Sequence, residues 1–148
     1  MQKESVWDYP RPSRVEPCTR RIRVSFGGEL ILDSERAMRV LETTHAPVYY
    51  ISRVDVRMEF LRPSKRKTVC EFKGQATYWS IRVNEKTAEN AAWSYEVPTP
   101  YFKVIEGHLA FYASRMDRCC VGDELVMPQP SEFYGGWITT DIEGPFKS

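Results

Sequence analysis

The sequence lacks any apolar run long enough to span a bilayer, and none of its cysteines forms the C-x-x-C pair of a structural zinc site. The first 23 residues are polar and charged, without the apolar core of a signal peptide. A formal net charge of +1 provides no field to attract nucleic acid or an anionic membrane. With two histidines in the chain, a histidine-based metal site is not expected. These absences predict a cytoplasmic protein with free thiols, no metal, no cofactor, and no nucleic-acid or membrane partner.

The composition predicts one folded domain. The 148 residues include 42% hydrophobic and 13% aromatic side chains, enough for a packed core without disulfides. Residues 1–20 contain several prolines among many charges, which is typical of an extended arm. This arm either packs on the domain through Trp7 and Tyr9 or is mobile. Residues 21–148 are expected to form a single β domain.

Short stretches of alternating or β-branched residues predict a mainly β fold. Ile22, Val24 and Phe26 alternate with polar residues, which is the period of a half-buried strand, and residues 27–28 (G-G) follow as a hairpin turn. The basic run at 64–67 is expected to be a solvated loop. Further strands are predicted at 29–33, 37–42, 48–51, 58–61, 69–83, 88–97 and 109–113.

One short helix is expected near residues 100–106. Thr99 can serve as its N-cap, Pro100 as its first residue and Gly107 as its C-terminal stop. Many short strands that are separated by turns and accompanied by one helix predict an all-β domain.

An ordered set of segments connects the chain with a known family. These segments are RRIRVSFGGELILDS, RAMRVLETTHAPVYYIS, DVRMEFLRPS, CEFKGQATYWSIRV, AENAAWSYEVPTP, HLAFYASRMD and GGWITTDIEGPFK. In this order they resemble the family called domain of unknown function 427, sometimes labelled nucleotidyltransferase-like, from about Val6 to the C-terminus. Many relatives have C-P-F-K-G where this chain has C-E-F-K-G at residues 70–74, so a backbone constraint on that loop is missing here.

The resemblance implies a β-tent-like fold, a single-domain arrangement of antiparallel sheets that lean together over a groove. Proteins with such folds include zinc carriers, a methionine sulfoxide reductase and domains that hold ligands in aromatic cages. Because this chain lacks paired C-x-x-C motifs, the resemblance implies neither a metal nor a reaction. The chain also lacks a G-S motif followed by paired aspartates and a glycine-rich phosphate loop, so nothing in the sequence supports nucleotidyl transfer.

Aromatic residues on or beside the predicted strands form the first candidate site. Tryptophan and tyrosine combine a large apolar face with a polar group, which suits a planar or cationic ligand. The alternative is that these residues pack in an ordinary core. Lys73 and Glu89 would orient the ligand. The full predicted ligand-binding set is Tyr49, Lys73, Trp79, Glu89, Trp93, Tyr95 and Trp137.

Glu89 is the main candidate for acid–base chemistry. In an extended strand over residues 88–97, Glu89 shares a face with Trp93 and Tyr95. A carboxylate enclosed by aromatic rings loses hydration, which favours its protonated form and suits a general acid or base. The alternative is a residue at the strand end that either reaches solvent or pairs with an arginine such as Arg82.

Cys70 is a candidate nucleophile. It lies three residues before Lys73, so the two side chains point to opposite faces of a straight strand and meet only if Gly74 or a bulge turns the backbone. Such a meeting would favour the reactive thiolate. Otherwise Cys70 is a buried apolar residue and Lys73 is a surface charge.

His45 is the third catalytic candidate. It lies in a turn just before an aromatic strand, where an imidazole could move a proton or cap a ligand. A Cys–His pair of Cys70 and His45 requires the fold to bring the two residues together.

These residues support three hypotheses about function. The first is a small-molecule-binding domain with an aromatic-lined groove. The second is an enzyme of unknown reaction that uses Glu89 as acid or base and Cys70 as nucleophile. The third is a protein-interaction module that docks a partner or a second copy through exposed strand edges, so self-association is left undetermined. The first is the working prediction.

Overall fold

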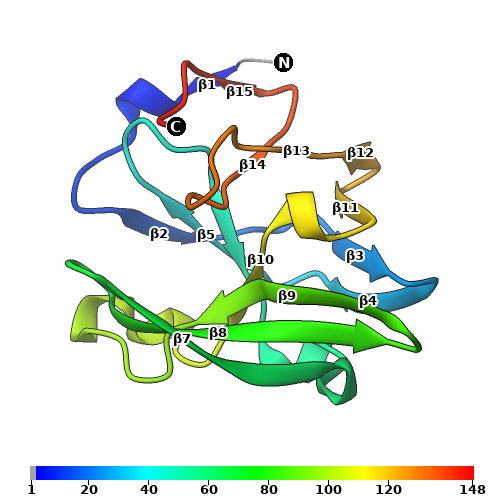
Figure 1. Ribbon diagram of the computed structural model, residues 1–148. Helices are drawn as coiled ribbons and strands as arrows, with labels where there is room; N and C mark the ends of the chain where they lie inside the picture. The colour runs from blue at the N-terminus through cyan, green and yellow to red at the C-terminus, as the bar shows by residue number, and fades with distance from the viewer. Residues whose placement is uncertain (1–2) are drawn as a thin grey trace.

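Two four-stranded antiparallel sheets carry most of the regular structure in the computed structural model, which describes residues 3–148 (Figure 1). In spatial order, the first sheet contains β10 (Leu109–Phe111), β9 (Lys86–Ser94), β8 (Gly74–Val83) and β7 (Leu61–Cys70). The second sheet contains, again in the order of neighbouring strands, β12 (Glu124–Leu125), β11 (Arg118–Val121), β3 (Ile22–Phe26) and β4 (Glu29–Ser34). The first sheet forms the lower layer of Figure 1, and the second lies above one side of it.

Three smaller sheets complete the fold. The largest of them contains β2 (Arg14–Pro17), β5 (Met38–Leu41) and β6 (Val48–Tyr50). A bridge between Ile51 and Leu109 joins it to the first large sheet. The two remaining pairs are β13 (Met127–Pro128) with β14 (Trp137–Ile138), and β1 (Glu4–Ser5) in parallel with β15 (Ile142–Glu143). The two ends of the described chain therefore lie together at the top of Figure 1.

The helical segments of residues 3–148 are short 3-10 turns, and η4 is the longest. Pro100 is its first residue, and Gly107 follows its end with a positive φ of 69°. The mainly β class, the antiparallel sheets and the short helix near residues 100–106 are confirmed. No helix in this range has the length and apolarity needed to cross a membrane. The segments are η1 (Val6–Asp8), η2 (Arg53–Asp55), η3 (Met58–Phe60), η4 (Pro100–Ile105) and η5 (Ala113–Arg115).

The predictions for residues 58–61 and for the basic run 64–67 are wrong. Residues 58–60 form η3 instead of a strand, and the basic run belongs to β7 instead of a loop. Pro63 is tolerated in β7 because this is the edge strand of its sheet, where no neighbour requires the missing N–H. Exposed basic side chains along such an edge also discourage pairing with another chain.

The expected long strand over residues 69–83 is instead a hairpin. Cys70 pairs with Gly74 across a tight turn, so the chain reverses direction between β7 and β8. Gly74 has a positive φ of 111°, a backbone conformation that glycine adopts without a steric penalty. This turn decides where the side chains of residues 70–73 point, and the candidate site depends on it.

The N-terminal arm predicted over residues 1–20 contributes strands to two sheets. Within it, β1 pairs with β15 and β2 pairs with β5. Tyr9 is buried, whereas Trp7 is 57% exposed and donates its indole N–H to the Pro145 carbonyl at 3.0 Å. Met1 and Gln2, which also belong to the predicted arm, lie outside the described residues.

Three clusters of buried side chains fill the interior of residues 3–148, and two of them contain most of the buried residues. The larger cluster is mainly aliphatic and includes residues from both large sheets, such as Ile22 and Ile81. The smaller cluster contains Tyr50, Tyr78 and Trp93 and lies between β5, β6, η4 and the first large sheet. Aromatic rings are large and rigid, so a cluster rich in them is harder to pack without gaps than an aliphatic one.

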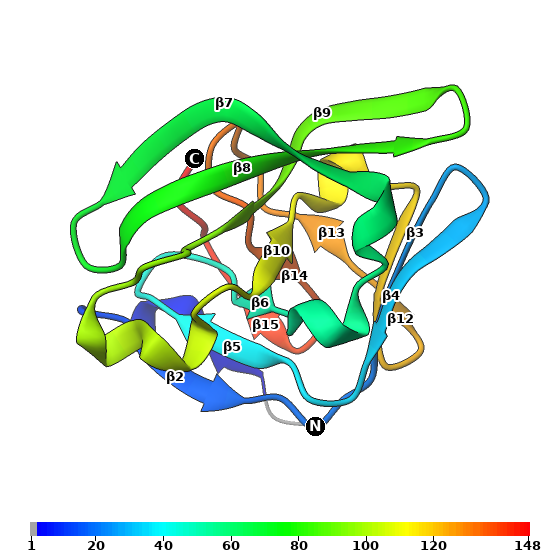
Figure 2. The same cartoon turned by 90° about the horizontal axis from the view of Figure 1, so that it is seen from below.

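The tips of the β3–β4 and β8–β9 hairpins lie side by side (Figure 2). Gly27 in the first tip has a positive φ of 62°, and a Cβ atom there would lie 2.9 Å from the Cβ of Val83. Its backbone N–H also donates to Asp117 at 2.8 Å, and Asp117 forms an ion pair with Lys86 of the second tip. This close approach leaves no room for a side chain at position 27.

Gly27→Ala and Gly122→Ala form a matched pair that tests this contact. Both glycines have a positive φ near 60°, but a Cβ at Gly122 would meet open space. We expect Gly122→Ala to lower the free energy of unfolding by about 1 kcal/mol, and Gly27→Ala by about 2–3 kcal/mol because of the additional clash with Val83. Urea denaturation measures both, and equal losses would contradict the packing of the two hairpin tips.

Candidate functional site

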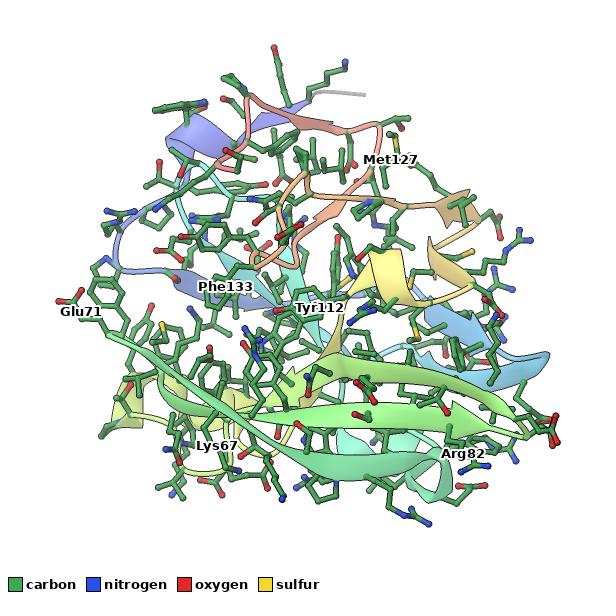
Figure 3. All side chains as sticks on the ribbon, viewed as in Figure 1. Lys67, Glu71, Arg82, Tyr112, Met127 and Phe133 are labelled. Carbon is green, nitrogen blue, oxygen red and sulfur yellow. The ribbon has the colours of Figure 1, made fainter. Side chains whose placement is uncertain are left out.

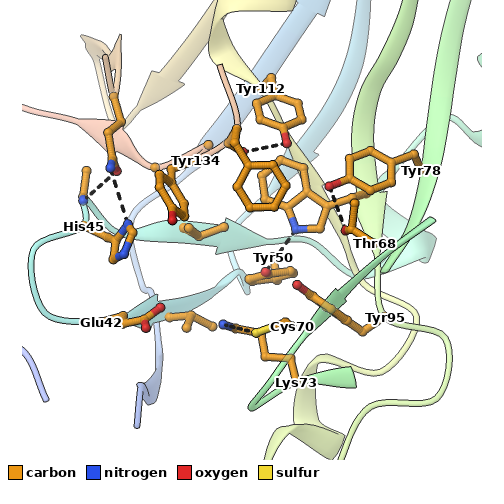
Figure 4. A pocket seen from close by; sticks show the side chains of 18 of the residues that line it. Glu42, His45, Tyr50, Thr68, Cys70, Lys73, Tyr78, Tyr95, Tyr112 and Tyr134 are labelled. Carbon is orange, nitrogen blue, oxygen red and sulfur yellow. Dashed lines mark hydrogen bonds between the residues drawn. The ribbon is translucent and has the colours of Figure 1, made fainter. Parts of the chain in front are cut away.

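A cavity of about 170 Å³ lies beside the smaller cluster (Figure 4). Its walls come from four places in the chain, namely β5–β6 with the turn between them, the segment from β7 to Tyr95, Tyr112 at the start of η5, and the C-terminal segment 129–136. Side chains from these segments line most of this space. The cavity therefore takes its chemical character from the residues that the strands direct inward.

Aromatic rings form one wall of the cavity. Tyr78 and Trp93 are partners across β8 and β9, so their side chains share one face of the sheet. The indole N–H of Trp93 donates to the Tyr50 hydroxyl at 3.2 Å, and the ring of Tyr112 lies 4.6 Å from the Trp93 ring. Tyr95 completes the wall, with its ring 6.3 Å from that of Tyr50. These faces are suited to stacking against a flat molecule.

The tyrosines of this wall are held in their neutral form. Burial raises the pKa of Tyr50, Tyr95 and Tyr112 above the ordinary value of 10.0, because the phenolate would lose its hydration. Their hydroxyls therefore remain able to donate hydrogen bonds at neutral pH. Tyr112 donates to the Phe133 carbonyl at 2.8 Å, and Figure 3 shows these two residues together above the β8–β9 layer.

Lys73 and Cys70 occupy another side of the cavity. The turn that follows β7 brings the Lys73 ammonium to 3.7 Å from the Cys70 sulfur. The Lys73 side chain is buried, with 7% of its surface exposed, and its ammonium lies 5.3 Å from the centre of the Phe102 ring. The turn thus places a thiol and an amine side by side at the cavity.

His45 lines the cavity on the side of the C-terminal segment. Its Nδ1 accepts a hydrogen bond from the Gln129 amide at 3.4 Å, and its ring contacts Tyr134 edge-on at 4.5 Å. Desolvation by burial is the main cause that lowers the pKa of His45 below 6.5; Lys147 and Lys73 lower it further, against the opposing charge of Glu42. The imidazole is therefore neutral at neutral pH, and because Nδ1 accepts from Gln129, Nε2 carries the proton and is a donor.

The C-terminal segment closes the cavity by close backbone contact. A Cβ on Gly135 would collide with the outer edge of the Trp93 indole, and a Cβ on Gly136 would collide with the Ala46 carbonyl. Gln129 fastens the segment because its side chain accepts from the Ala46 N–H at 3.0 Å and donates to the Lys147 carbonyl at 2.7 Å. The segment therefore packs directly on the aromatic wall.

The structure brings several of the predicted site residues together and separates the others. Those that line the cavity are Lys73, Trp93 and Tyr95 from the ligand-binding set, and Cys70 and His45 from the catalytic candidates. Those that lie elsewhere are Tyr49, Trp79, Trp137 and Glu89. The meeting of Cys70 with Lys73, which required a turn in the backbone, occurs at the β7–β8 hairpin.

Placing Tyr49, Trp79 and Trp137 at the cavity is wrong. Trp79 packs against the larger cluster and donates its indole N–H to the Ser94 hydroxyl at 2.9 Å. Tyr49 and Trp137 are both buried in the larger cluster with their rings 5.3 Å apart, and the Trp137 indole donates to the Phe111 carbonyl at 2.9 Å. Each of these rings is part of the ordinary core.

Strand alternation explains the two errors on β6 and β8. Tyr49 precedes Tyr50 and Trp79 follows Tyr78, so within each pair the side chains point to opposite faces of the sheet. Tyr50 and Tyr78 line the cavity, whereas their neighbours enter the core. The sequence shows that each pair divides between two faces, but it does not show which face meets a cavity.

The predicted enclosure of Glu89 by aromatic rings is wrong. β9 bulges between Ala88, which pairs with Ile81, and Ala92, which pairs with Trp79. Asn90 within the bulge has a positive φ of 51°, so the backbone is not extended there. Glu89 consequently points into solvent and is withdrawn as an acid–base candidate.

Several cavity residues were missed because they come from segments without periodic patterning. Tyr112 lies at the start of η5, while Gln129, Phe133 and Tyr134 belong to the irregular C-terminal segment. The abundance of aromatic residues in this segment was the available signal, but no spacing rule connects them with β9. Among residues 3–148, no group of three or more His, Cys, Asp or Glu side chains is placed to hold a metal ion.

The neutral state of His45 makes folding stability depend on pH. Because the pKa is lower in the folded protein than the ordinary 6.5, the unfolded chain binds the extra proton first. The contribution of neutral His45 to the free energy of unfolding is fully present above about pH 6.5. It is lost as the pH falls from there through the lower pKa that His45 has in the folded protein. We expect His45→Asn, which keeps an acceptor near the Nδ1 position, to reduce the loss of stability between pH 7 and pH 5.

Urea denaturation at a series of pH values measures this effect, with the half-buried His108 as control. The His108→Asn variant retains the buried imidazole and should follow the wild-type curve. Identical pH dependence in wild type and His45→Asn would contradict the assignment.

Comparison with known proteins adds a family but no activity. No curated protein matches the chain. The family model described as Domain of unknown function (DUF427) matches residues 14–122, a segment that contains Tyr50, Cys70, Lys73 and Trp93 but ends before the C-terminal wall of the cavity. Since this segment is more than half of the chain, the protein belongs to the DUF427 family.

Proposed function

We propose that this protein binds a small planar molecule in the cavity lined by Trp93. The observation that carries the proposal is the aromatic wall, in which the rings of Tyr50, Trp93 and Tyr112 surround a space of about 170 Å³. An apolar cavity of about 150 Å³ in a protein core accommodates benzene. A one-ring compound is therefore the size of ligand that fits this space.

Polar groups at the cavity support a ligand with a fixed orientation. Lys73 offers an ammonium, neutral His45 offers its Nε2–H donor, and the Tyr95 hydroxyl is a donor in its neutral form. A few directed polar groups on a mainly apolar surface are the usual arrangement in small-molecule sites. We also propose the cytoplasm as the compartment, which the four free thiols support.

Tryptophan fluorescence tests the binding proposal, because Trp93 lies at the cavity whereas Trp7 lies at the surface near Pro145. We expect one-ring ligands to quench the fluorescence saturably in the wild type and in Trp7→Phe. In Trp93→Phe the amplitude should fall severalfold, with the fold retained by circular dichroism. Absence of saturable quenching across a library of one-ring compounds would contradict the proposal.

A second candidate function is catalysis with Cys70 as nucleophile. The observation that favours it is the 3.7 Å contact of the Cys70 sulfur with the Lys73 ammonium at the cavity. A thiolate in such a site can form a covalent intermediate with an electrophilic substrate. Glu89 has no part in this version, since it lies in solvent.

Iodoacetamide labelling of the native protein tests the reactivity of Cys70. Cys18, Cys119 and Cys120 are buried, whereas Cys70 is half-buried and has the ammonium neighbour. We expect Cys70 to be labelled at least about tenfold faster than the other three, and Lys73→Met to slow it several-fold. Peptide mass spectrometry locates the label, and an equal rate in wild type and Lys73→Met would remove the nucleophile assignment.

A further inference from the structure

Lys73 forms no ion pair with any carboxylate of residues 3–148. Its side chain is 7% exposed. Its one side-chain hydrogen bond goes to the Cys70 sulfur at 3.7 Å, although an ammonium has three donors and sulfur is a weak acceptor. The Phe102 ring, 5.3 Å away, supplies a cation–π contact alone.

A buried charge without a partner is costly, so proteins pair such groups or place them where a ligand will pair them. Lys73 lines the cavity, and its donors are therefore within reach of a molecule bound there. We propose that the ligand is a one-ring planar anion, whose ring stacks in the aromatic wall and whose carboxylate accepts hydrogen bonds from Lys73. This inference rests on the proposed function.

The other polar groups at the cavity agree with an anionic ligand. Glu42 is the acidic residue of the lining, and its carboxylate lies 3.9 Å from the guanidinium of Arg11, which offsets its charge. His45 is neutral at neutral pH, and Gln129 carries no charge. A cationic ligand would gain contact with the ring faces but would be repelled by the buried ammonium.

The cavity also limits the shape of the anion. The space of about 170 Å³ accommodates a single ring with one small substituent, and the C-terminal segment at Gly135 packs against the edge of Trp93. An anion much larger than a benzoate would have to displace that segment. Benzoate is therefore a suitable probe for the size and the charge of the site.

Three compounds of nearly identical shape separate charge from size. Benzoate is anionic, benzamide is neutral and benzamidine is cationic, while all three present the same ring. Isothermal titration of the full chain at neutral pH should give a dissociation constant for benzoate at least about tenfold lower than for benzamide, with benzamidine weakest. Raising the salt concentration should weaken benzoate binding more than benzamide binding.

Lys73→Met tests the residue itself. This variant should bind benzamide as the wild type does but lose the preference for benzoate, whereas Lys103→Met on the exposed surface of η4 should keep it. Circular dichroism and thermal unfolding establish that each variant is folded. If Lys73→Met does not fold, the comparison of the three compounds in the wild type still decides the proposal.

The possible results separate this inference from the proposed function. Benzamide or benzamidine binding as tightly as benzoate would overturn the anionic ligand and leave the aromatic binding site standing. A benzoate preference that survives in folded Lys73→Met would overturn the role of the lysine. Failure of all three compounds to bind would remove the anion inference, and the one-ring library measured by fluorescence would then decide the binding proposal by itself.

Discussion

The candidate site depends on the hydrogen bond from the Trp93 indole to the Tyr50 hydroxyl, which links side chains of two sheets that the Ile51–Leu109 bridge already joins. Trp93 belongs to β9 and Tyr50 to β6, and their rings meet edge to face with centres 6.4 Å apart. This geometry directs two large rings toward one space without allowing them to fill it. Rigid rings leave gaps in packing more readily than aliphatic chains do, and the cavity lies beside these two rings.

The C-terminal segment converts this open arrangement into an enclosed one. Gly135 and Gly136 permit backbone contact with the Trp93 indole and with the Ala46 carbonyl, and Gln129 ties the segment to both Ala46 and the chain end at Lys147. The same segment contributes Tyr134, which packs on the neutral imidazole of His45. The cavity thus has one wall from the segment matched by the family and one from residues beyond it.

Reasoning from the sequence identified most strands and the chemistry of several cavity residues. The alternation of residues 22–26 and the glycine turn after them correctly located the first hairpin. Trp93, Tyr95, Cys70, Lys73 and His45 were chosen for their chemistry, and all of them line the cavity. Two of the errors arose where the backbone departs from a straight strand. The bulge at Asn90 exposes Glu89, and the turn before Gly74 divides what was expected to be one strand.

What the sequence alone determined is local: where strands occur, which neighbouring residues must point to opposite faces, and which side chains have useful chemistry. Which face of each strand meets a cavity was decided by the packing of whole sheets. Tyr49 and Tyr50 illustrate the division, since alternation separates them but tertiary contacts place one in the core and the other at the cavity. Strand pairing and sheet packing join segments that are distant in the chain, and the local pattern of residues does not predict those contacts.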